Sequence, residues 1–485
     1  MVGGFKNLYL EKIVTTARKL TSNTIIQLGG KLVSVVLGLA VVALMTRALG
    51  AEGFGQYTTI VAFLQLAGIL VDLGLTVTTG KTIAQGVYTE HKLLSNIFSF
   101  RTLTALVAFS LAPVAALAFP YPGIIKIGIA LVSVSFFATS IAQTFGAVFQ
   151  KYLKTGWFVA AELVGRILLL ILTAWAAASG APLTTFLWAV VAGSVVNGLL
   201  VLIFARRLTV FGWEVDFSVW KSIWQETWPV ALTIALNLVY FKTDTIILSL
   251  YQSAADVGIY GASYKVLEIL LAIPTIIGGL LLPLVTALVV QKAFVEIKKY
   301  YQASLDIMLA AGLGLVAACL VVGKETMVFL AGSEFTIAGE VLKIVAIATG
   351  LIFFGNLIGY FILAFGKQRQ MIKYYAVAAV ASLIGYFIFI PQYSYWAAAW
   401  VTVAIEGFMM LAALWILRAQ VLPSLRRWPN IILAAMGLGA FLWLVPTWPF
   451  LLKVFSGVII YPALLYIFKA LPRNIWQVFK AQSSV

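Results

Sequence analysis

The stretch TRALGAEGFGQY, from Thr46 to Tyr57, is a short turn broken by three glycines between two long apolar runs. A similar turn, SAADVGIY from Ser253 to Tyr260, also separates two apolar runs. When Gly55-Gln56-Tyr57 is aligned with Gly258-Ile259-Tyr260, an acidic residue lies a few positions upstream in each copy and the flanking runs coincide. We interpret the two turns as the opening hairpins of two halves of a duplicated chain.

The composition is that of a membrane protein. Of 485 residues, 62% are hydrophobic and only 10% are charged, and the mean hydropathy is +1.03. Soluble domains carry about 25% charged residues. Apolar runs of about 20 residues recur along the chain, and this is the length that a helix needs to cross a bilayer core of about 30 Å. The sequence therefore predicts an all-α polytopic membrane protein.

The apolar runs and the loops between them predict about fourteen spans in two similar halves. Trp220, Trp224 and Trp228 are four residues apart and share one face of a helix, as expected of a segment at headgroup level. The predicted parts are an N-terminal six-helix lobe with a basic amphipathic lead-in (1–207), an interfacial linker helix (208–227), a C-terminal six-helix lobe (228–427), and two additional spans with a tail (428–485).

Lysine and arginine alternate between the loops. Every even-numbered loop and both termini carry at least two basic residues, whereas the odd-numbered loops carry one or none apart from Lys324 and Lys343. Because positively charged loops stay in the cytoplasm, we expect both termini to be cytoplasmic in a cell-membrane protein. This topology accounts for most of the net charge of +16 without nucleic acid. Two halves of six spans share one orientation, and parallel repeats of this kind place a substrate site at their interface.

The organisation and the motifs resemble those of the multidrug/oligosaccharidyl-lipid/polysaccharide exporter superfamily, and within it the polysaccharide repeat-unit (Wzx-type) flippases. The motifs are TRALG at 46–50, GFGQY at 53–57, FKTD at 241–244 and VGIY at 257–260. The resemblance covers the whole chain. It implies a flippase that moves a polyprenyl-diphosphate-linked oligosaccharide from the inner to the outer leaflet for cell-surface polysaccharide synthesis. The partners it implies are that lipid-linked substrate, membrane lipids and the polysaccharide polymerase machinery.

Ionisable side chains within the spans are the candidate functional residues, because each costs about 2.5 to 3.5 kcal/mol to insert. Cations suit the substrate diphosphate, and carboxylates suit a coupling cation or proton. The candidate substrate-binding residues are Lys31, Arg101, Arg166, Lys242 and Lys265, and the candidate coupling residues are Asp72, Asp244 and Glu268.

The candidates in the first half each have a structural alternative. Lys31 lies about two helical turns into its span, where it either lines a cavity or reaches the cytoplasmic interface. Arg101 either anchors its helix at the inner headgroups or captures phosphate on entry. Glu162 is four residues before Arg166 and can neutralise it. Asp72 either binds the coupling ion or is a buried, hydrogen-bonded carboxyl.

The second half contains the strongest signal. Lys242 and Asp244 are two residues apart, so they point to different faces of their helix and each needs its own partner or a cavity. Lys265 and Glu268 are three residues apart and either pair with each other or line the cavity. Glu406 is isolated in span twelve and is a further candidate for a protonatable group.

The glycines of the first turn, Gly50, Gly53 and Gly55, permit positive φ, and we expect them to act as a hinge between inward-open and outward-open states. The chain has no P-loop motif, no metal-ligand cluster and no long outer loop with the paired groups of a polymerase. We therefore predict neither enzyme activity nor a cofactor. The alternative function is a cation-coupled exporter of small amphipathic molecules, but its cavity should be acidic and aromatic, and the basic excess favours the flippase.

Overall fold

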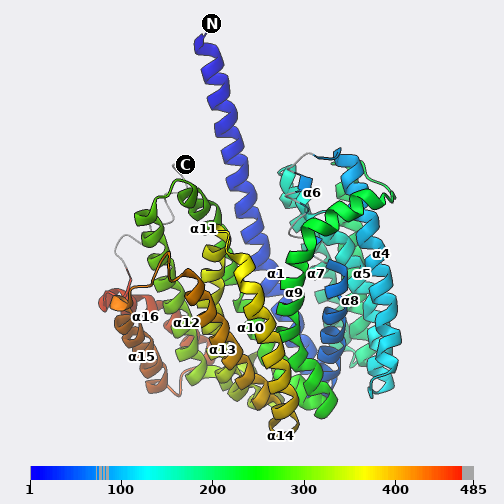
Figure 1. Ribbon diagram of the computed structural model, residues 1–485. Helices are drawn as coiled ribbons and strands as arrows, with labels where there is room; N and C mark the ends of the chain where they lie inside the picture. The colour runs from blue at the N-terminus through cyan, green and yellow to red at the C-terminus, as the bar shows by residue number, and fades with distance from the viewer. Residues whose placement is uncertain (1, 73, 76–78, 80–81, 84–86, 472–485) are drawn as a thin grey trace. The chain divides into compact units, whose positions relative to one another are not determined.

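The computed structural model describes residues 2–72, 74–75, 79, 82–83 and 87–471 (Figure 1). Every regular element within those residues is a helix, as predicted. The last predicted part of the chain (428–485) ends in a tail, and from residue 472 onward this tail lies outside the described residues.

Contacts between backbone positions divide the chain into two compact units. Unit 1 comprises residues 1–49 and 56–238, and unit 2 comprises residues 50–55 and 239–485. The helices that begin in unit 1 are α1 (Val2–Ala67), α2 (Ile69–Asp72), α4 (Glu90–Leu117), α5 (Gly123–Thr144), α6 (Gly146–Lys151), α7 (Thr155–Ala178), α8 (Leu183–Arg206) and α9 (Phe217–Tyr251).

Unit 2 contains the end of α9 and the remaining helices. They are α10 (Ala254–Leu270), α11 (Ala272–Val290), α12 (Phe294–Ala331), η1 (Ser333–Phe335), α13 (Thr336–Ala364), α14 (Gln368–Leu417), η2 (Leu425–Arg427), α15 (Trp428–Leu444) and α16 (Phe450–Ile467).

Within the described residues, 12 helical segments are long and apolar enough to cross a membrane. Two of them contain a kink with non-helical backbone angles, at Gly50 in α1 and at Ser394 in α14. When each kinked segment is counted as two spans, the total is the predicted fourteen. The kink at Gly50 lies in the glycine turn of 46–57, and the kink at Ser394 follows Pro391-Gln392-Tyr393, the segment that separates spans eleven and twelve.

The junction between the halves differs in form from a separate linker helix. After Arg207 the chain runs without helix to Asp216, and α9 then continues unbroken from Phe217 to Tyr251. The tryptophan-rich segment and span seven are thus one helix, and the boundary between the compact units falls within it. The division into two six-helix lobes and two added spans stays a prediction.

The non-helical stretch is held on α4 by polar side chains. Extended backbone leaves N–H groups that need acceptors. Ser95 Oγ accepts a bond from Gly212 N (3.1 Å), Ser99 Oγ one from Glu214 N (2.9 Å), and Asn96 Oδ1 one from Asp216 N (2.8 Å). An ion pair between Lys92 Nζ and Asp216 Oδ2 (2.7 Å) completes this attachment at the start of α9.

The two turns that the sequence aligns lie against each other in unit 2. A Cβ at Gly55 would lie 1.7 Å from the carbonyl oxygen of Ala254, and a Cβ at Gly258 would lie 2.0 Å from that of Ala51. Each glycine therefore faces the carbonyl four residues before the other glycine. This reciprocal contact matches the alignment of the two turns, and it needs glycine in both places because the backbones touch.

Gly50 is the point at which α1 bends. It has φ 65° and ψ −174°, a conformation that favours glycine. The segment that follows is fixed within unit 2 by Glu334 Oε1, which accepts a bond from Ala51 N (3.1 Å), and by an edge-to-face contact between Phe54 and Phe335. Gly50 alone among the three predicted hinge glycines has a positive φ; Gly53 and Gly55 lie within the helix after the bend.

Candidate functional site

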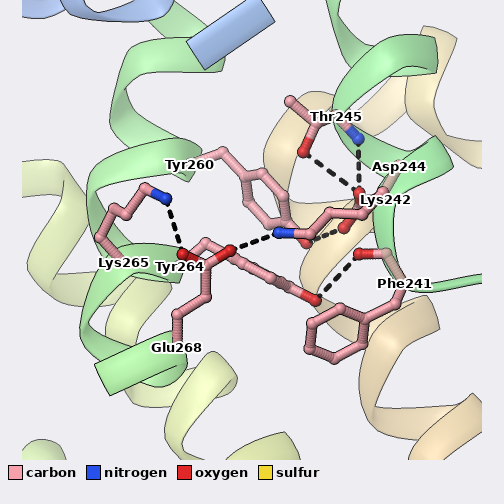
Figure 2. Close-up of polar contacts among 8 residues, drawn as sticks. All are labelled: Phe241, Lys242, Asp244, Thr245, Tyr260, Tyr264, Lys265 and Glu268. Carbon is pink, nitrogen blue, oxygen red and sulfur yellow. Dashed lines mark hydrogen bonds and ion pairs between the residues drawn. The ribbon is translucent and has the colours of Figure 1, made fainter. Parts of the chain in front are cut away.

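A carboxylate shared by two lysines forms the centre of the polar cluster in unit 2 (Figure 2). Lys242, on α9, bonds to one oxygen of Glu268, and Lys265 Nζ lies 2.6 Å from the other oxygen. Both Lys265 and Glu268 are on α10, one turn apart, as the sequence spacing allows. The three side chains carry a net charge of +1, and Lys265 keeps 25% of its side-chain surface exposed.

Aromatic rings surround the Lys242 ammonium. Its nitrogen lies 5.5 Å from the ring centre of Phe241 and 5.2 Å from that of Tyr264. Tyr264 is itself held in place because its hydroxyl donates to the carbonyl of Phe241 (3.2 Å). Ring faces attract a cation within about 6 Å. Lys242 is therefore stabilised as a charged group although it is largely buried.

Asp244, two residues after Lys242 on α9, has hydrogen-bond partners of its own, as its spacing from Lys242 predicts. It has no exposed surface. Thr245 donates to Asp244 Oδ1 through its backbone N (2.6 Å) and its hydroxyl (3.1 Å), and Tyr260 OH donates to Oδ2 (2.5 Å) (Figure 2). Within the described residues no cation lies at ion-pair distance from this carboxylate.

The structure brings together two candidates that the sequence treats separately. Arg101, on α4, is 1% exposed, and its Nη2 lies 2.9 Å from Asp72 Oδ1 at the end of α2. The same nitrogen lies 2.9 Å from Gln143 Oε1, and Nε donates to Ser140 Oγ (3.1 Å). The guanidinium thus joins three helices within unit 1. An anchor at the lipid headgroups, one of the two alternatives for Arg101, does not fit this burial.

The other candidates of unit 1 form a second carboxylate-centred cluster. Arg166 Nε lies 3.0 Å from Glu162 Oε1, so the predicted pairing one turn apart on α7 is present. Ser34 Oγ, on α1, donates to the same oxygen (2.5 Å). Lys31, one turn earlier on α1 and exposed, adds an electrostatic attraction to Glu162.

The two units therefore carry similar clusters. In unit 2 the carboxylate of Glu268 pairs with Lys242 and Lys265. In unit 1 that of Glu162 pairs with Arg166 and is attracted by Lys31 on a different helix. The net positive charge and the partial exposure of Arg166 and Lys265 allow each cluster to bind an anion. Ammonium and guanidinium groups donate several hydrogen bonds to phosphate oxygens, which makes phosphate the ligand class that fits.

Several partners were missed from the sequence. Tyr260 and Ser34 were not among the candidates, although Tyr260 ends the second quoted turn. Lys453, on α16, is 2% exposed and bonds Glu325 Oε1 (2.7 Å) and the carbonyl of Pro446 (2.9 Å). Such pairings join helices that are distant in sequence, so spacing along one helix cannot reveal them. Glu406 is 6% exposed, and its Oε1 has no hydrogen-bond partner among the described residues.

Comparisons with known proteins place the chain in a family. Residues 20–289, more than half of the chain, match the model of a family described as "Polysaccharide biosynthesis protein". No curated protein sequence matches the chain.

Solved structures share the fold at low sequence identity. The chain resembles a lipid II flippase, MurJ, in an inward closed conformation, with TM-score 0.75 and 12% identity over 92% of this chain and 98% of that one. It also resembles an inward-facing MATE family multidrug resistance transporter of the MOP superfamily (TM-score 0.64, 12% identity, 87% and 99% coverage). A Vibrio cholerae MATE transporter, VcmN, matches with TM-score 0.55 and 17% identity over 84% and 98%.

These proteins are flippases and transporters rather than enzymes, in agreement with the absence of catalytic motifs from the sequence. The structure has the MurJ/MATE-like helical fold, and the chain belongs to the family described as "Polysaccharide biosynthesis protein".

Proposed function

We propose that the protein is a flippase that carries a polyprenyl-diphosphate-linked oligosaccharide from the inner to the outer leaflet for cell-surface polysaccharide synthesis. The observation that carries the proposal is the cluster of Lys242, Lys265 and Glu268, two cations held by one carboxylate in a membrane-spanning unit. The family match supports a polysaccharide intermediate as the cargo. The fold supports alternating access as the mode of transport.

The diphosphate of the substrate would replace Glu268 as the partner of the two lysines. A diphosphate carries more negative charge than one carboxylate and has more acceptor oxygens, so the exchange is favourable in a poorly solvated site. Lys242 stays in place on the rings of Phe241 and Tyr264, and the more exposed Lys265 is the group that first meets the ligand. Lys31 and Arg166 offer the same chemistry in unit 1, where Glu162 is the competing anion.

Asp244 is the coupling group that we propose. Glu268 already bonds two lysines and Asp72 bonds Arg101, so the charges of these two carboxylates are balanced. Asp244 is buried with hydrogen bonds but with no cation at ion-pair distance within the described residues. A buried carboxylate of this kind is stabilised by binding a proton or a cation. Binding there would change its bond to Tyr260 and thus the contact between α9 and α10.

Genetic complementation tests the function. The wild-type chain would be expressed in a cell lacking its own oligosaccharide flippase, and surface polysaccharide and lipid-linked repeat units would be measured. Rescue with clearance of the precursor is the expected result. Lys242→Ala and Lys265→Ala should abolish rescue at normal protein levels, whereas Lys324→Ala, which removes an exposed lysine of another carboxylate cluster, should not. Full rescue by both cluster variants would refute the site.

The fold similarity to MATE transporters favours a second candidate, a cation-coupled exporter of small amphipathic molecules. Positively charged drugs would be repelled by two clusters of net positive charge, so this function predicts transport that is maintained or increased when Lys242 and Lys265 are replaced by neutral residues. Efflux of a cationic dye from the same cells separates the two candidates, because the flippase leaves dye accumulation unchanged.

A further inference from the structure

A third group of cations lies at the two ends of α14, and none of the candidate residues belongs to it. The bend at Ser394, where φ is 52°, divides this helix into arms of nearly equal length. The two ends consequently meet and line a pocket of about 390 Å³ in unit 2. Its lining includes Arg369, Gln370, Lys373, Tyr374, Trp415 and Arg418.

The positive charges of this pocket are not balanced by carboxylates. Among the described residues, no carboxylate lies at ion-pair distance from Arg369, Lys373 or Arg418. Six other cations of unit 2, Lys242, Lys265, Lys324, Lys343, Arg427 and Lys453, form ion pairs. The exposed cations Lys298, Lys299 and Arg426 have no ion pair within the described residues, but they do not line this pocket. Three like charges around one pocket repel each other, and an anion between them removes that repulsion.

Aromatic side chains support two of the cations. The guanidinium carbon of Arg418 lies 3.1 Å from the ring centre of Trp415, and Lys373 Nζ lies 5.0 Å from that of Tyr374. Stacking on a ring restricts the guanidinium while its N–H groups can still donate. Trp415 is 58% exposed, and an exposed tryptophan at the end of a spanning helix is typical of the headgroup level. The pocket thus places hydrogen-bond donors for an anion beside Trp415, an exposed side chain that is typical of the headgroup level.

We propose that this pocket binds a phosphate group through Arg369, Lys373 and Arg418. The pattern of basic loops predicts that both ends of α14 face the cytoplasm. On that side of a membrane, basic pockets between helices bind anionic headgroups. Two sources offer the same chemistry: the phosphodiester of an anionic phospholipid in the inner leaflet, and a soluble phosphate compound. The proposal does not depend on the proposed flippase activity.

The test uses the purified full-length protein in nanodiscs of phosphatidylcholine. Phosphatidylglycerol would be titrated into the lipid, and bound lipid measured by native mass spectrometry. The test variant is Arg369→Gln/Lys373→Gln/Arg418→Gln. The matched control is Lys298→Gln/Lys299→Gln/Arg426→Gln, which removes three exposed basic residues of α12 and η2 that do not line the pocket. We expect the test variant to lose at least about tenfold in apparent affinity and the control to stay within about twofold.

A second arm distinguishes the two sources. Inorganic pyrophosphate would be titrated into the same nanodiscs without anionic lipid. If the wild type binds pyrophosphate and the test variant does not, the pocket is assigned to a soluble phosphate. If the wild type binds phosphatidylglycerol but not pyrophosphate, the pocket is assigned to the lipid. Equal binding of both probes by the wild type and the test variant overturns the proposal, and so does an equal loss in the control.

A charge-preserving variant keeps the test valid if the triple substitution lowers the yield of folded protein. Arg369→Lys/Arg418→Lys retains all three charges but removes both guanidinium forks and the stacking of Arg418 on Trp415. Partial loss of affinity, between that of the wild type and that of the triple variant, is expected. Unchanged affinity would contradict a phosphate bound by the guanidinium groups.

Discussion

Glu268 is the residue on which the proposed binding site depends, because its one carboxylate holds Lys242 and Lys265 in the absence of ligand. An anionic ligand has to compete with it. Glu268→Gln removes the competing charge and should tighten binding by about tenfold, the amount that one charge-assisted bond contributes. The measurement is the affinity of the detergent-solubilised protein for a short-chain prenyl diphosphate.

Glu340 provides a matched control for this experiment. It also lies between two lysines, Lys324 (3.0 Å) and Lys343 (2.9 Å), but belongs to a different part of unit 2. Glu340→Gln should leave the affinity for the prenyl diphosphate unchanged. If Glu268→Gln binds no more tightly than the wild type, Glu268 does not compete with the ligand at this site.

Arg101 has a different expected role from the other cations. It is buried with partners on α2 and α5, and removing one member of a buried pair costs about 3 to 5 kcal/mol. Arg101→Gln should therefore lower the thermal stability of purified protein, and adding Asp72→Asn should recover part of the loss because it removes the charge that Arg101 balances. Normal stability with loss of transport alone would instead indicate direct contact with substrate.

Gly55 and Gly258, each of which faces a carbonyl of the other turn, fix the bend between the first and second spans. Gly258→Ala would place a Cβ 2.0 Å from the carbonyl oxygen of Ala51. Because this distance is too short for a contact, the backbone has to move. Overpacking of this kind costs about 1 to 3 kcal/mol. Gly279→Ala on α11 adds the same atom in open space and is the matched control. Equal unfolding temperatures for the two variants would contradict the contact.

The attachment of α9 to α4 has a predictable pH dependence. Lys92 and the hydrogen bonds from Ser218 hold the pKa of Asp216 below its ordinary value near 3.8. Because the folded-state pKa is the lower one, its contribution to stability is complete above about pH 4 and is lost as pH falls through the folded-state pKa.

We therefore expect the wild type to lose stability more steeply than Asp216→Asn as the pH falls below about 4, measured by thermal unfolding. Asn96→Ala removes the acceptor for Asp216 N without changing any charge, and its pH slope should match that of the wild type. An identical slope in Asp216→Asn would show that the ion pair contributes nothing to this dependence.

At the scale of the whole molecule, the spans could be predicted from the sequence because bilayer thickness fixes the length of each apolar run. The bends could be located because Gly50 and the segment before Ser394 interrupt those runs. Pairs on one helix, such as Glu162 with Arg166, could also be predicted because they need only helical geometry.

The pairs between helices could not be predicted. Arg101 with Asp72 and Lys242 with Glu268 depend on how each helix is rotated about its axis. Spanning helices are apolar on most faces, so the sequence does not specify that rotation. The basic pocket at the ends of α14 could not be predicted for a related reason. Its cations are far apart in sequence, and the sequence indicates only that their loops face the cytoplasm.

We propose that this protein moves a diphosphate-linked oligosaccharide lipid between leaflets by means of Lys242 and Lys265. The most direct measurement reconstitutes the wild type in vesicles that contain a fluorescent polyprenyl-diphosphate oligosaccharide and follows its access to a membrane-impermeant quencher. We expect protein-dependent transfer that Lys242→Gln/Lys265→Gln abolishes and Lys324→Gln/Lys343→Gln preserves. Transfer that is equal in both double variants, or no transfer by vesicles that do transport a cationic dye, would contradict this proposal.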